Sequence, residues 1–398
     1  MLTRKTVLLG VCGGIAAFKI AGLASALRKL HCNVHVIMTE HATNFITPIT
    51  FEELTGNRCI TQIFDRNFVH NVQHVALAKQ ADLCLIAPAT ANVIAKMAHG
   101  IADDMLTTTV LACNCPKLVA PAMNTAMLDN PVTQRNLRLL QEDGFTLIPP
   151  ACGYLACGDT GRGKLPEPEI LLQYIQQAIA KPKDMHGLKV LVTAGPTREA
   201  LDPVRYLTNH SSGRMGYALA NMAACRGAEV TLVTGPTQLP PPLFAKVVPV
   251  VSAKEMFEAV TAHVAQQDVV VMAAAVADYS PAEYSPQKRK KSALNMTIPL
   301  APTQDILAYL GANRRPGQFL CGFSMETHEV VRYAREKLLK KQVDMMVAND
   351  VTQPGAGFAL PTNAVTIITK NGEVSLPLQS KEEVACEIFD RILQMRAH

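Results

Sequence analysis

Two groups of lysines in the C-terminal half of the chain could bind a polyphosphate. The first is the run Lys288-Arg-Lys-Lys291, in a long loop-like segment that follows an apolar stretch and Asp278. The second is the pair Lys337 and Lys341, which a helix would place one turn apart on one face. Lysines so placed could neutralise a nucleoside triphosphate. Solvated surface is the alternative for both groups, and Asp278 could accept hydrogen bonds from a base or simply cap a turn.

The N-terminal half carries polar groups of a different kind. Gly13 and Gly14 precede a helix-like run and could cradle a phosphate at a helix N-terminus, although ordinary turn glycines fit equally well. His74 could be an exposed or hydrogen-bonded histidine without a catalytic role, and Asn124 could simply cap a helix. Cys157 lies in a glycine-rich segment, which predicts a mobile flap with a thiol on it or a loop with an incidental cysteine.

Alternating strands and helices must position the first set of residues. Strands are expected at 5–11, 34–38, 83–87, 117–120 and 145–148. This alternation predicts a parallel, doubly wound α/β sheet with its ligand beyond the carboxyl ends of the strands. Glu40 at one strand end could hold a ribose or be a surface acid. Because the glycine turn is not GxGxxG, a mononucleotide fits better than NAD.

The stretch from Gly187 to Arg205 repeats the layout of the N-terminus, an apolar run that enters a glycine turn. A charged, proline-broken segment at 181–184 precedes it and has the composition of a linker. Two α/β domains are therefore expected, with a boundary between residues 187 and 188. In the second domain a polar loop is expected at 197–209 and a helix at 211–224. Strands are expected at 190–193, 230–233, 247–250, 268–275, 319–323, 343–348 and 365–368.

Composition limits the possible classes of protein. The chain has 398 residues, of which 48% are hydrophobic and 18% charged, and a net charge of +5. These values suit two folded domains that bind anionic small molecules, and no nucleic-acid-binding signature is present. No signal peptide or membrane helix is expected, so the eleven cysteines predict reduced thiols in the cytosol. Structural zinc at Cys113 and Cys115, or at Cys152 and Cys157, is the alternative.

Five motifs, in order, resemble the homo-oligomeric flavin-containing cysteine decarboxylases over residues 1 to about 180. They are Gly13-Gly14-Ile-Ala-Ala-Phe-Lys19, His74, Pro88-Ala-Thr-Ala-Asn92, Pro121-Ala-Met-Asn-Thr-Ala-Met127 and Gly153-Tyr-Leu-Ala-Cys-Gly158. The resemblance implies FMN bound at a subunit interface within trimers, by Gly13, Gly14, Ile15, Thr39, Ala89, Thr90 and Asn92. It also implies three catalytic residues. His74 would orient the substrate thiol and carboxylate, Asn124 would hold the carboxylate, and Cys157 would protonate the ene-thiolate product. Leu128 departs from the family, where tryptophan is frequent.

A second group of motifs resembles the phosphopantothenate–cysteine ligases over residues 188 to 398. These motifs are Gly195-Pro-Thr-Arg-Glu199, Asp202-Pro-Val-Arg205, Asn209, Ser211-Ser-Gly-Arg-Met-Gly216, Ala273-Ala-Ala-Val-Ala-Asp-Tyr279 and the lysine pattern at 288–291. The resemblance implies CTP and Mg²⁺, and it assigns the acyl-cytidylate intermediate to Asn209 and Lys288. CTP would contact Ala274, Asp278, Lys288, Gln304, Asp305, Ile306, Leu307, Phe323, Lys337 and Lys341. The magnesium ligands are left open.

Together the two halves resemble the bacterial family of bifunctional coenzyme A biosynthesis proteins. Such a protein would ligate 4′-phosphopantothenate to cysteine and then decarboxylate the product to 4′-phosphopantetheine, in the cytoplasm and without nucleic-acid or membrane partners. The family implies a homo-oligomer, a dodecamer of trimeric flavin domains joined by dimeric ligase domains. The alternatives are a nicotinamide-dependent two-domain oxidoreductase, which predicts a GxGxxG turn, and a non-enzymatic scaffold, which predicts no bound flavin.

Overall fold

A computed structural model describes residues 2–64, 73–156, 158–288, 297–326, 328–350, 357 and 360–397. The chain divides into two compact units, Met1–Pro182 and Lys183–His398. The expected boundary after residue 187 lies five residues beyond this division. Within the described residues, none of the helices is both long enough and apolar enough to span a membrane.

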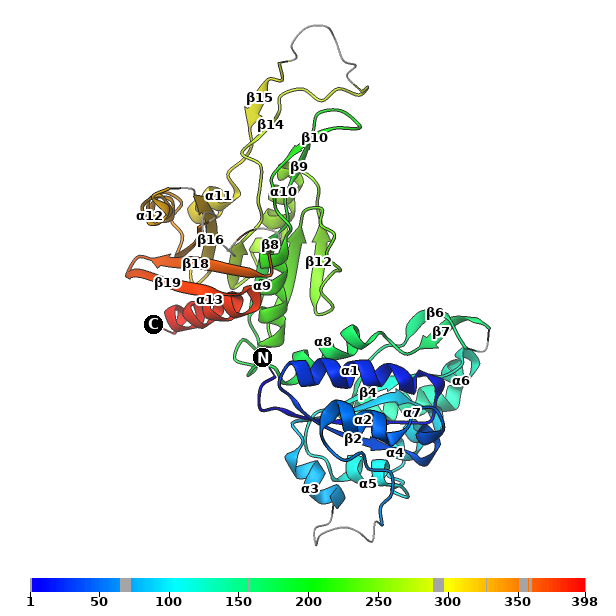
Figure 1. The fold of residues 1–398 in the computed structure, drawn as a ribbon. Coiled ribbons are helices and arrows are strands. Elements are labelled where there is room, and N and C mark those ends of the chain that lie inside the picture. The colour runs from blue at the N-terminus through cyan, green and yellow to red at the C-terminus, as the bar shows by residue number, and fades with distance from the viewer. Residues whose placement is uncertain are drawn as a thin grey trace. The chain divides into compact units, whose positions relative to one another are not determined.

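The first unit is built on a five-stranded parallel sheet in the order β2-β1-β3-β4-β5 (Figure 1). Its strands are β1 (Thr6–Val11), β2 (Asn33–Met38), β3 (Leu83–Ala89), β4 (Lys117–Pro121) and β5 (Thr146–Leu147). These positions follow the sequence expectation closely, because buried parallel strands read as continuous apolar runs. A separate antiparallel hairpin, β6 (Ala151–Tyr154) and β7 (Thr160–Lys164), occupies the glycine-rich segment that we expected to be a flap.

Helices cover both faces of the first sheet and create two hydrophobic cores. On one face pack α1 (Phe18–Lys29), α2 (Pro48–Thr55) and α8 (Pro168–Ile179). On the other pack α3 (Gln73–Gln80), α4 (Ala91–Ala98), α5 (Met105–Ala112) and α7 (Pro131–Glu142). The short helices are η1 (Ile15–Ala17), η2 (Glu40–Asn44) and α6 (Thr125–Asp129). Leu128, at the position where tryptophan is frequent, is buried in the second of these cores.

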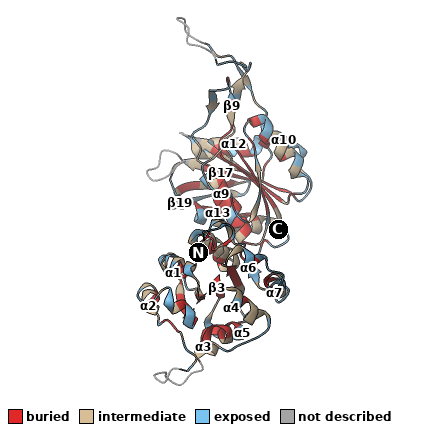
Figure 2. Ribbon diagram, turned by 90° about the vertical axis from the view of Figure 1, so that its right-hand side faces the viewer, coloured by how far each residue is buried: buried red, intermediate tan, exposed pale blue. Residues whose placement is uncertain are grey.

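The second unit contains an eight-stranded sheet in the order β12-β11-β8-β13-β16-β17-β18-β19. The first six strands are parallel, and β18 and β19 close the sheet with antiparallel pairing. Its strands are β8 (Lys189–Ala194), β11 (Glu229–Thr234), β12 (Ala245–Pro249), β13 (Val269–Met272), β16 (Phe319–Glu326), β17 (Met345–Asp350), β18 (Thr362–Thr369) and β19 (Gly372–Ser380). Figure 2 shows the buried strands in red between the helical layers.

The helices of the second unit again form two layers. On one face pack α9 (Arg214–Cys225) and α13 (Lys381–Arg396). On the other pack α10 (Ala253–Val264), α11 (Ile306–Asn313) and α12 (Val330–Lys340). The two layers supply different side chains to one cavity, which is lined by residues of α9 and α13 and by residues of α11 and α12.

The segment 197–209, expected to be a polar loop, instead forms a small antiparallel hairpin. Its strands are β9 (Arg198–Ala200) and β10 (Tyr206–Thr208). The buried Asp202 carboxylate closes the turn by accepting hydrogen bonds from the backbone and guanidinium of Arg205. A second short pair, β14 (Tyr279–Pro281) and β15 (Leu300–Pro302), closes the base of the segment that contains the lysine run.

Candidate active sites

The first unit contains a cavity of about 1240 Å³ at the carboxyl ends of its strands. Six of the seven residues expected to bind FMN line it: Gly13, Gly14, Ile15, Thr39, Thr90 and Asn92. The seventh, Ala89, is the fully buried last residue of β3 and does not line the cavity. Motifs that are far apart in the sequence therefore meet at one place.

Two features of this cavity suit a bound ligand, as the flavin prediction requires. The hydroxyl of Thr39 is buried and forms no hydrogen bond with any part of the described chain, so a donor or acceptor is missing there. A Cβ atom added to Gly13 would lie 2.4 Å from Cβ of His41. Only glycine allows the loop after β1 to pass so close to His41, which follows β2. This close approach leaves the N-terminus of the helix after the loop open to a ligand.

The charged groups of this cavity largely neutralise one another. Lys19 lies 2.8 Å from Glu167, and Lys96 contacts both Asp103 and Asp104. The hydrogen bond to Asp103 holds the pKa of the Lys96 ammonium above its usual range. With its lysines already paired, the cavity offers mainly neutral donors to a phosphate, namely backbone N–H groups near Gly14 and the threonine hydroxyls.

Asn124 lines the same cavity and also caps a helix, so the capping interpretation is confirmed and the catalytic one stays a prediction. Its Oδ1 accepts a hydrogen bond from the backbone of Ala126 at the start of α6, and its Nδ2 donates to Asp159 at 3.3 Å. The hairpin residues Tyr154, Leu155 and Ala156 also line the cavity. Cys157 lies outside the described residues, but its neighbour in sequence, Ala156, is thus at the cavity wall.

His74 does not line the flavin cavity of its own chain. It lies half-buried near the start of α3, a helix that packs against α5. The family resemblance places His74 and Asn124 in one catalytic set. Within a single chain, however, the two residues do not line the same cavity.

The second unit contains a cavity of about 600 Å³ at the carboxyl ends of β13, β16 and β17. Nine of the ten residues expected to bind CTP line it: Ala274, Asp278, Gln304, Asp305, Ile306, Leu307, Phe323, Lys337 and Lys341. Lys341 forms an ion pair of 3.1 Å with Asp305, whose carboxylate also caps α11. The expectation that Lys337 and Lys341 share one helix face is confirmed, since both reach this cavity.

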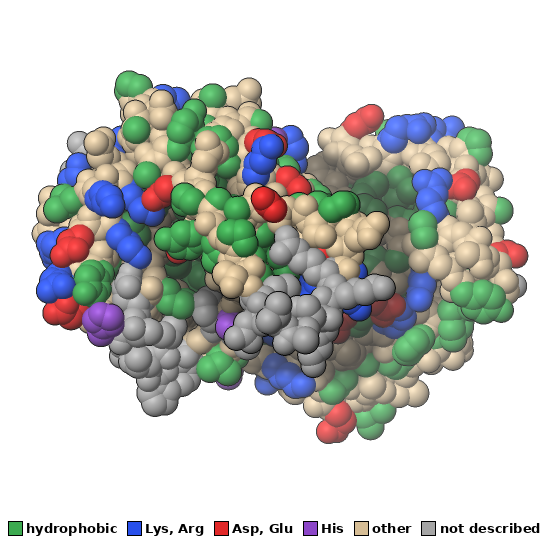
Figure 3. Space-filling view, turned by 90° about the horizontal axis from the view of Figure 1, so that it is seen from above, with side chains coloured by type: hydrophobic (Ala, Val, Ile, Leu, Met, Phe, Trp, Pro, Cys, Tyr) green, Lys and Arg blue, Asp and Glu red, His purple; other side chains and the backbone are tan. Residues whose placement is uncertain are grey.

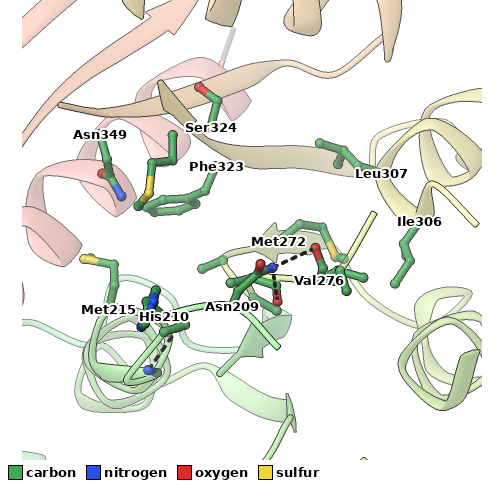
Figure 4. Close-up of a pocket in the computed structure, with 18 of the residues that line it drawn as sticks. Asn209, His210, Met215, Met272, Val276, Ile306, Leu307, Phe323, Ser324 and Asn349 are labelled. Atoms are coloured by element: carbon green, nitrogen blue, oxygen red, sulfur yellow. Dashed lines mark hydrogen bonds between the residues drawn. The ribbon is translucent and has the colours of Figure 1, made fainter. Parts of the chain in front are cut away.

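Asn209 lies in the middle of this cavity, between its two sides (Figure 4). Its Nδ2 donates hydrogen bonds to the carbonyl oxygens of Ala275 and Val276, at 3.2 and 3.3 Å. Because the amide nitrogen is held by two carbonyls, the amide oxygen is the atom that can accept a hydrogen bond from a substrate.

Lys288 is the exception among the expected nucleotide ligands. It is exposed, follows β14, and does not line the cavity of its own unit. The remainder of the lysine run lies outside the described residues. In the part of the chain that is described, no group of three or more His, Cys, Asp or Glu side chains is arranged to hold a metal ion.

Two cationic side chains at this cavity were not expected from the sequence. Arg214 is the first residue of α9, and Lys381 is the first residue of α13, where only 4% of its surface is exposed. The Ser-Ser-Gly-Arg motif contains Arg214 and offered a signal for it. Lys381 had none, because a lysine at a helix start is ordinarily solvated.

The two halves of the chain match two family models. Residues 1–180 match the flavoprotein family, and residues 185–395 match the DNA/pantothenate metabolism flavoprotein C-terminal domain. The coenzyme A biosynthesis bifunctional protein CoaBC of Bacillus subtilis (strain 168) is 46% identical to this chain over 98% of it and 97% of the relative.

Solved structures resemble each half separately. The C-terminal domain of a coenzyme A biosynthesis bifunctional protein CoaBC is 45% identical, covers 54% of this chain and 97% of its own, and has a TM-score of 0.46. The FMN-dependent cysteine decarboxylase SpaF is 35% identical, covers 44% of this chain and 99% of its own, and has a TM-score of 0.39.

Proposed function

This chain belongs to the family of coenzyme A biosynthesis bifunctional proteins, and we propose that its two units divide the two reactions of that family between them. The enzyme ligates 4′-phosphopantothenate to cysteine and decarboxylates the resulting phosphopantothenoylcysteine to 4′-phosphopantetheine. Our proposal assigns decarboxylation with FMN to residues 1–187 and ligation to residues 188–398. The observation that carries it is that each half gathers most of the ligand-binding residues expected for its own reaction around a separate cavity.

The ligase unit must activate a carboxylate before an amine can attack it. We propose that CTP supplies the activating group, with its nucleotide held by the residues of the second cavity from Ala274 to Lys341. Attack of the carboxylate on the α-phosphorus gives an acyl-cytidylate and pyrophosphate, and the cysteine amine then displaces CMP. The amide of Asn209, oriented by the carbonyls of Ala275 and Val276, can hold this mixed anhydride without acting as a nucleophile.

Neutralisation of the triphosphate is the second requirement of ligation. Mg²⁺ is proposed as the cation that would neutralise part of the triphosphate charge, because such ions are usually held by phosphates with few protein ligands. Lys288 is proposed to complete this neutralisation. Since it is exposed and lies away from the cavity of its own unit, we propose that it reaches the nucleotide bound to a second copy of the chain.

In the decarboxylase unit, this chain's residues bind and orient phosphopantothenoylcysteine. Asn124 at the cavity wall is proposed to hold the substrate carboxylate as a neutral donor, which avoids stabilising the anion too strongly before CO2 leaves. FMN, when bound, supplies the two-electron oxidation and reduction that make the carbon–carbon bond labile. Cys157 is proposed to protonate the ene-thiolate product, and the hairpin β6–β7 around it to exclude water.

Association of identical chains is proposed because His74 does not reach the cavity that contains Asn124. A neighbouring copy would supply the missing histidine, as expected for trimers with FMN at their interface. Large apolar side chains at the cavity remain exposed in the single chain, including Ile15, Phe18, Met127 and Tyr154, each more than half exposed. Figure 3 shows hydrophobic side chains at the surface among the charged ones. A dodecamer of trimers and dimers is the proposed assembly, and the cytoplasm the proposed location, where free thiols such as Cys152 stay reduced.

Flavin content tests the assignment of the first cavity. The purified protein is expected to be yellow and to release FMN on denaturation. Thr39→Val removes the unpaired hydroxyl and should lower FMN retention, whereas Thr366→Val, which removes a hydroxyl bonded to Ser375 in the other unit, should not. Colourless wild-type protein that cannot be reconstituted with FMN would contradict the decarboxylase assignment, and equal retention in both variants would contradict the role of Thr39.

A further inference from the structure

The second unit has another cavity, of about 580 Å³, which lies away from the ligase site. Three arginines line it, Arg314, Arg315 and Arg396, together with one carboxylate, Asp344. Phe319, which begins β16, also lines it, and Asp344 directly precedes β17. This arginine cavity is therefore at the amino ends of strands whose carboxyl ends form the ligase cavity. Within the described residues the two cavities share no lining residue.

A tight turn positions two of these arginines. Residues 315–318 read Arg-Pro-Gly-Gln, and the backbone N–H of Gln318 donates a hydrogen bond to the carbonyl oxygen of Arg315 at 3.2 Å. Pro316 has a fixed φ and Gly317 a φ of 77°, the combination typical of a type II turn. The side-chain amide of Gln318 is buried and donates to two backbone carbonyl oxygens, both at 2.8 Å. The turn is therefore fixed to the rest of the unit before any ligand binds.

Each of the three guanidinium groups uses only one of its nitrogen atoms within the part of the chain that is described. Nη1 of Arg314 donates to both carboxylate oxygens of Asp344, at 2.8 Å. Nη2 of Arg315 donates to Oδ1 of Asp268 and to a backbone carbonyl, both at 2.8 Å. Nη1 of Arg396 donates to two backbone carbonyl oxygens, at 2.8 and 3.1 Å. Because a guanidinium carries N–H groups on all three of its nitrogens, most of these donors are left for a ligand.

The two carboxylates that hold these arginines are already committed to the sheet. Asp344 also accepts a hydrogen bond from the backbone N–H of Leu320, and Asp268 accepts one from the backbone N–H of Lys189, both at 2.9 Å. Burial raises the pKa of the Asp268 carboxyl, but this bond and Arg315 outweigh burial and hold the pKa below its usual range. Three guanidinium ions thus face two carboxylate ions, which leaves an excess of positive charge among these groups.

We propose that Arg314, Arg315 and Arg396 bind a phosphate group in the arginine cavity, at a site separate from both catalytic cavities. Ion pairing and the negative ends of α11 and α13 are ordinary reasons for arginines at such positions. These reasons account for the engaged nitrogen of each group, but they do not require three arginines to line one cavity. Guanidinium forks match the oxygens of phosphate, and Phe319 and Met395 offer apolar walls to the organic part of a phosphate ester.

Hydrogen exchange on the FMN-loaded full chain tests the site and locates it, because phosphate could also enter the catalytic cavities. Exchange is measured across a titration with inorganic phosphate at constant ionic strength, in wild type, Arg315→Gln and Arg396→Gln. The control is Arg391→Gln, which removes an ion-paired arginine of the same helix as Arg396 that does not line the cavity. Because Arg396 also fastens the end of α13, the more exposed Arg315 variant carries the test alone if the other does not fold.

In the wild type, phosphate should slow exchange in residues 314–320 and at the end of α13. Arg315→Gln and Arg396→Gln should each raise the phosphate concentration needed by roughly tenfold to a hundredfold, because each removes charge-assisted donors. Arg391→Gln should stay within about twofold of wild type. No slowing in these segments of the wild type, or the same phosphate dependence in all the proteins, would overturn the site.

A titration with phenyl phosphate separates the two sources of a phosphate group. Tighter binding of phenyl phosphate than of inorganic phosphate would identify a phosphate ester as the ligand. Tighter binding of inorganic phosphate would identify the free ion. Either order upholds the site, provided that the Arg315→Gln variant loses affinity for both compounds, and retained affinity for both in that variant would overturn it.

Discussion

Asn209 is held in place by the backbone rather than by other side chains. Its amide nitrogen bonds the carbonyls of Ala275 and Val276, which follow β13. Asn209→Ala removes the group that we propose to face the acyl-cytidylate, so ligation should fall by roughly a hundredfold or more, as for loss of one oriented hydrogen-bonding group in other active sites. The rate of ligation is measured as the release of pyrophosphate and CMP.

The same Asn209→Ala variant should decarboxylate supplied phosphopantothenoylcysteine at the wild-type rate, because that reaction belongs to the other unit. Loss of both activities in folded protein would contradict the division of labour between the units. An unchanged rate of ligation would instead mean that Asn209 has no role in the ligation mechanism.

Lys288 tests whether an exposed lysine can act on the nucleotide. We expect Lys288→Gln to lower the ligation rate by roughly thirtyfold to a thousandfold, equivalent to about 2–4 kcal/mol of transition-state stabilisation. Lys370→Gln is the matched control, since it removes an equal charge from an exposed position at the turn between β18 and β19. Equally small effects of the two changes would mean that Lys288 is a solvated surface charge without a role in ligation.

Some features of individual residues could not be predicted from the sequence. The types and order of Gly13, Thr39 and Asn124 were enough to place them at one flavin cavity, because each follows an apolar strand. The burial of Lys381 depends on where α13 packs, which a local pattern does not encode. The grouping of His74 with Asn124 by motif stays a prediction, and the fold shows that His74 does not line the cavity of its own chain.

At the scale of elements, alanine substitutions at two helical glycines are expected to change stability in opposite directions. Gly216 in α9 packs against β8, and an added Cβ would lie 2.8 Å from a backbone oxygen, whereas one on Gly22 in α1 would lie 3.7 Å from Pro168. Gly216→Ala should therefore destabilise the second unit by about 1–3 kcal/mol, as overpacking does. Gly22→Ala should stabilise the first unit by about 0.5–1 kcal/mol through helix propensity.

Hydrogen exchange measured in α9 and α1 reports the stability of the two units separately. Faster exchange in α9 of Gly216→Ala, and slower exchange in α1 of Gly22→Ala, are the expected results. If both changes stabilised their helices, the close approach of α9 to β8, and with it the placement of the α9 N-terminus at the cavity, would be wrong.

The sequence predicted the buried parallel strands better than the short antiparallel ones. Continuous apolar runs such as those of β1, β3 and β8 leave little choice of structure. The hairpin β9–β10 consists of two three-residue strands closed by a buried aspartate, and neither strand alternates clearly between polar and apolar residues. Tertiary contacts determine the structure of such segments, so the sequence pattern predicted a loop where the two strands form.

At the scale of the whole molecule, the two units catalyse consecutive steps. The amide bond made by the second unit produces the substrate that the first unit decarboxylates. Each unit has its own sheet, its own pair of hydrophobic cores and its own cavity. The two activities should therefore fail independently when one cavity is altered.

The most direct test of this account is mass spectrometry of the products formed from 4′-phosphopantothenate, cysteine, CTP and Mg²⁺. Wild-type protein with bound FMN should give 4′-phosphopantetheine, CMP, pyrophosphate and CO2. Protein stripped of FMN should stop at phosphopantothenoylcysteine, with CMP and pyrophosphate still formed. Production of 4′-phosphopantetheine by flavin-free protein, or failure of the wild type to form phosphopantothenoylcysteine at all, would contradict it.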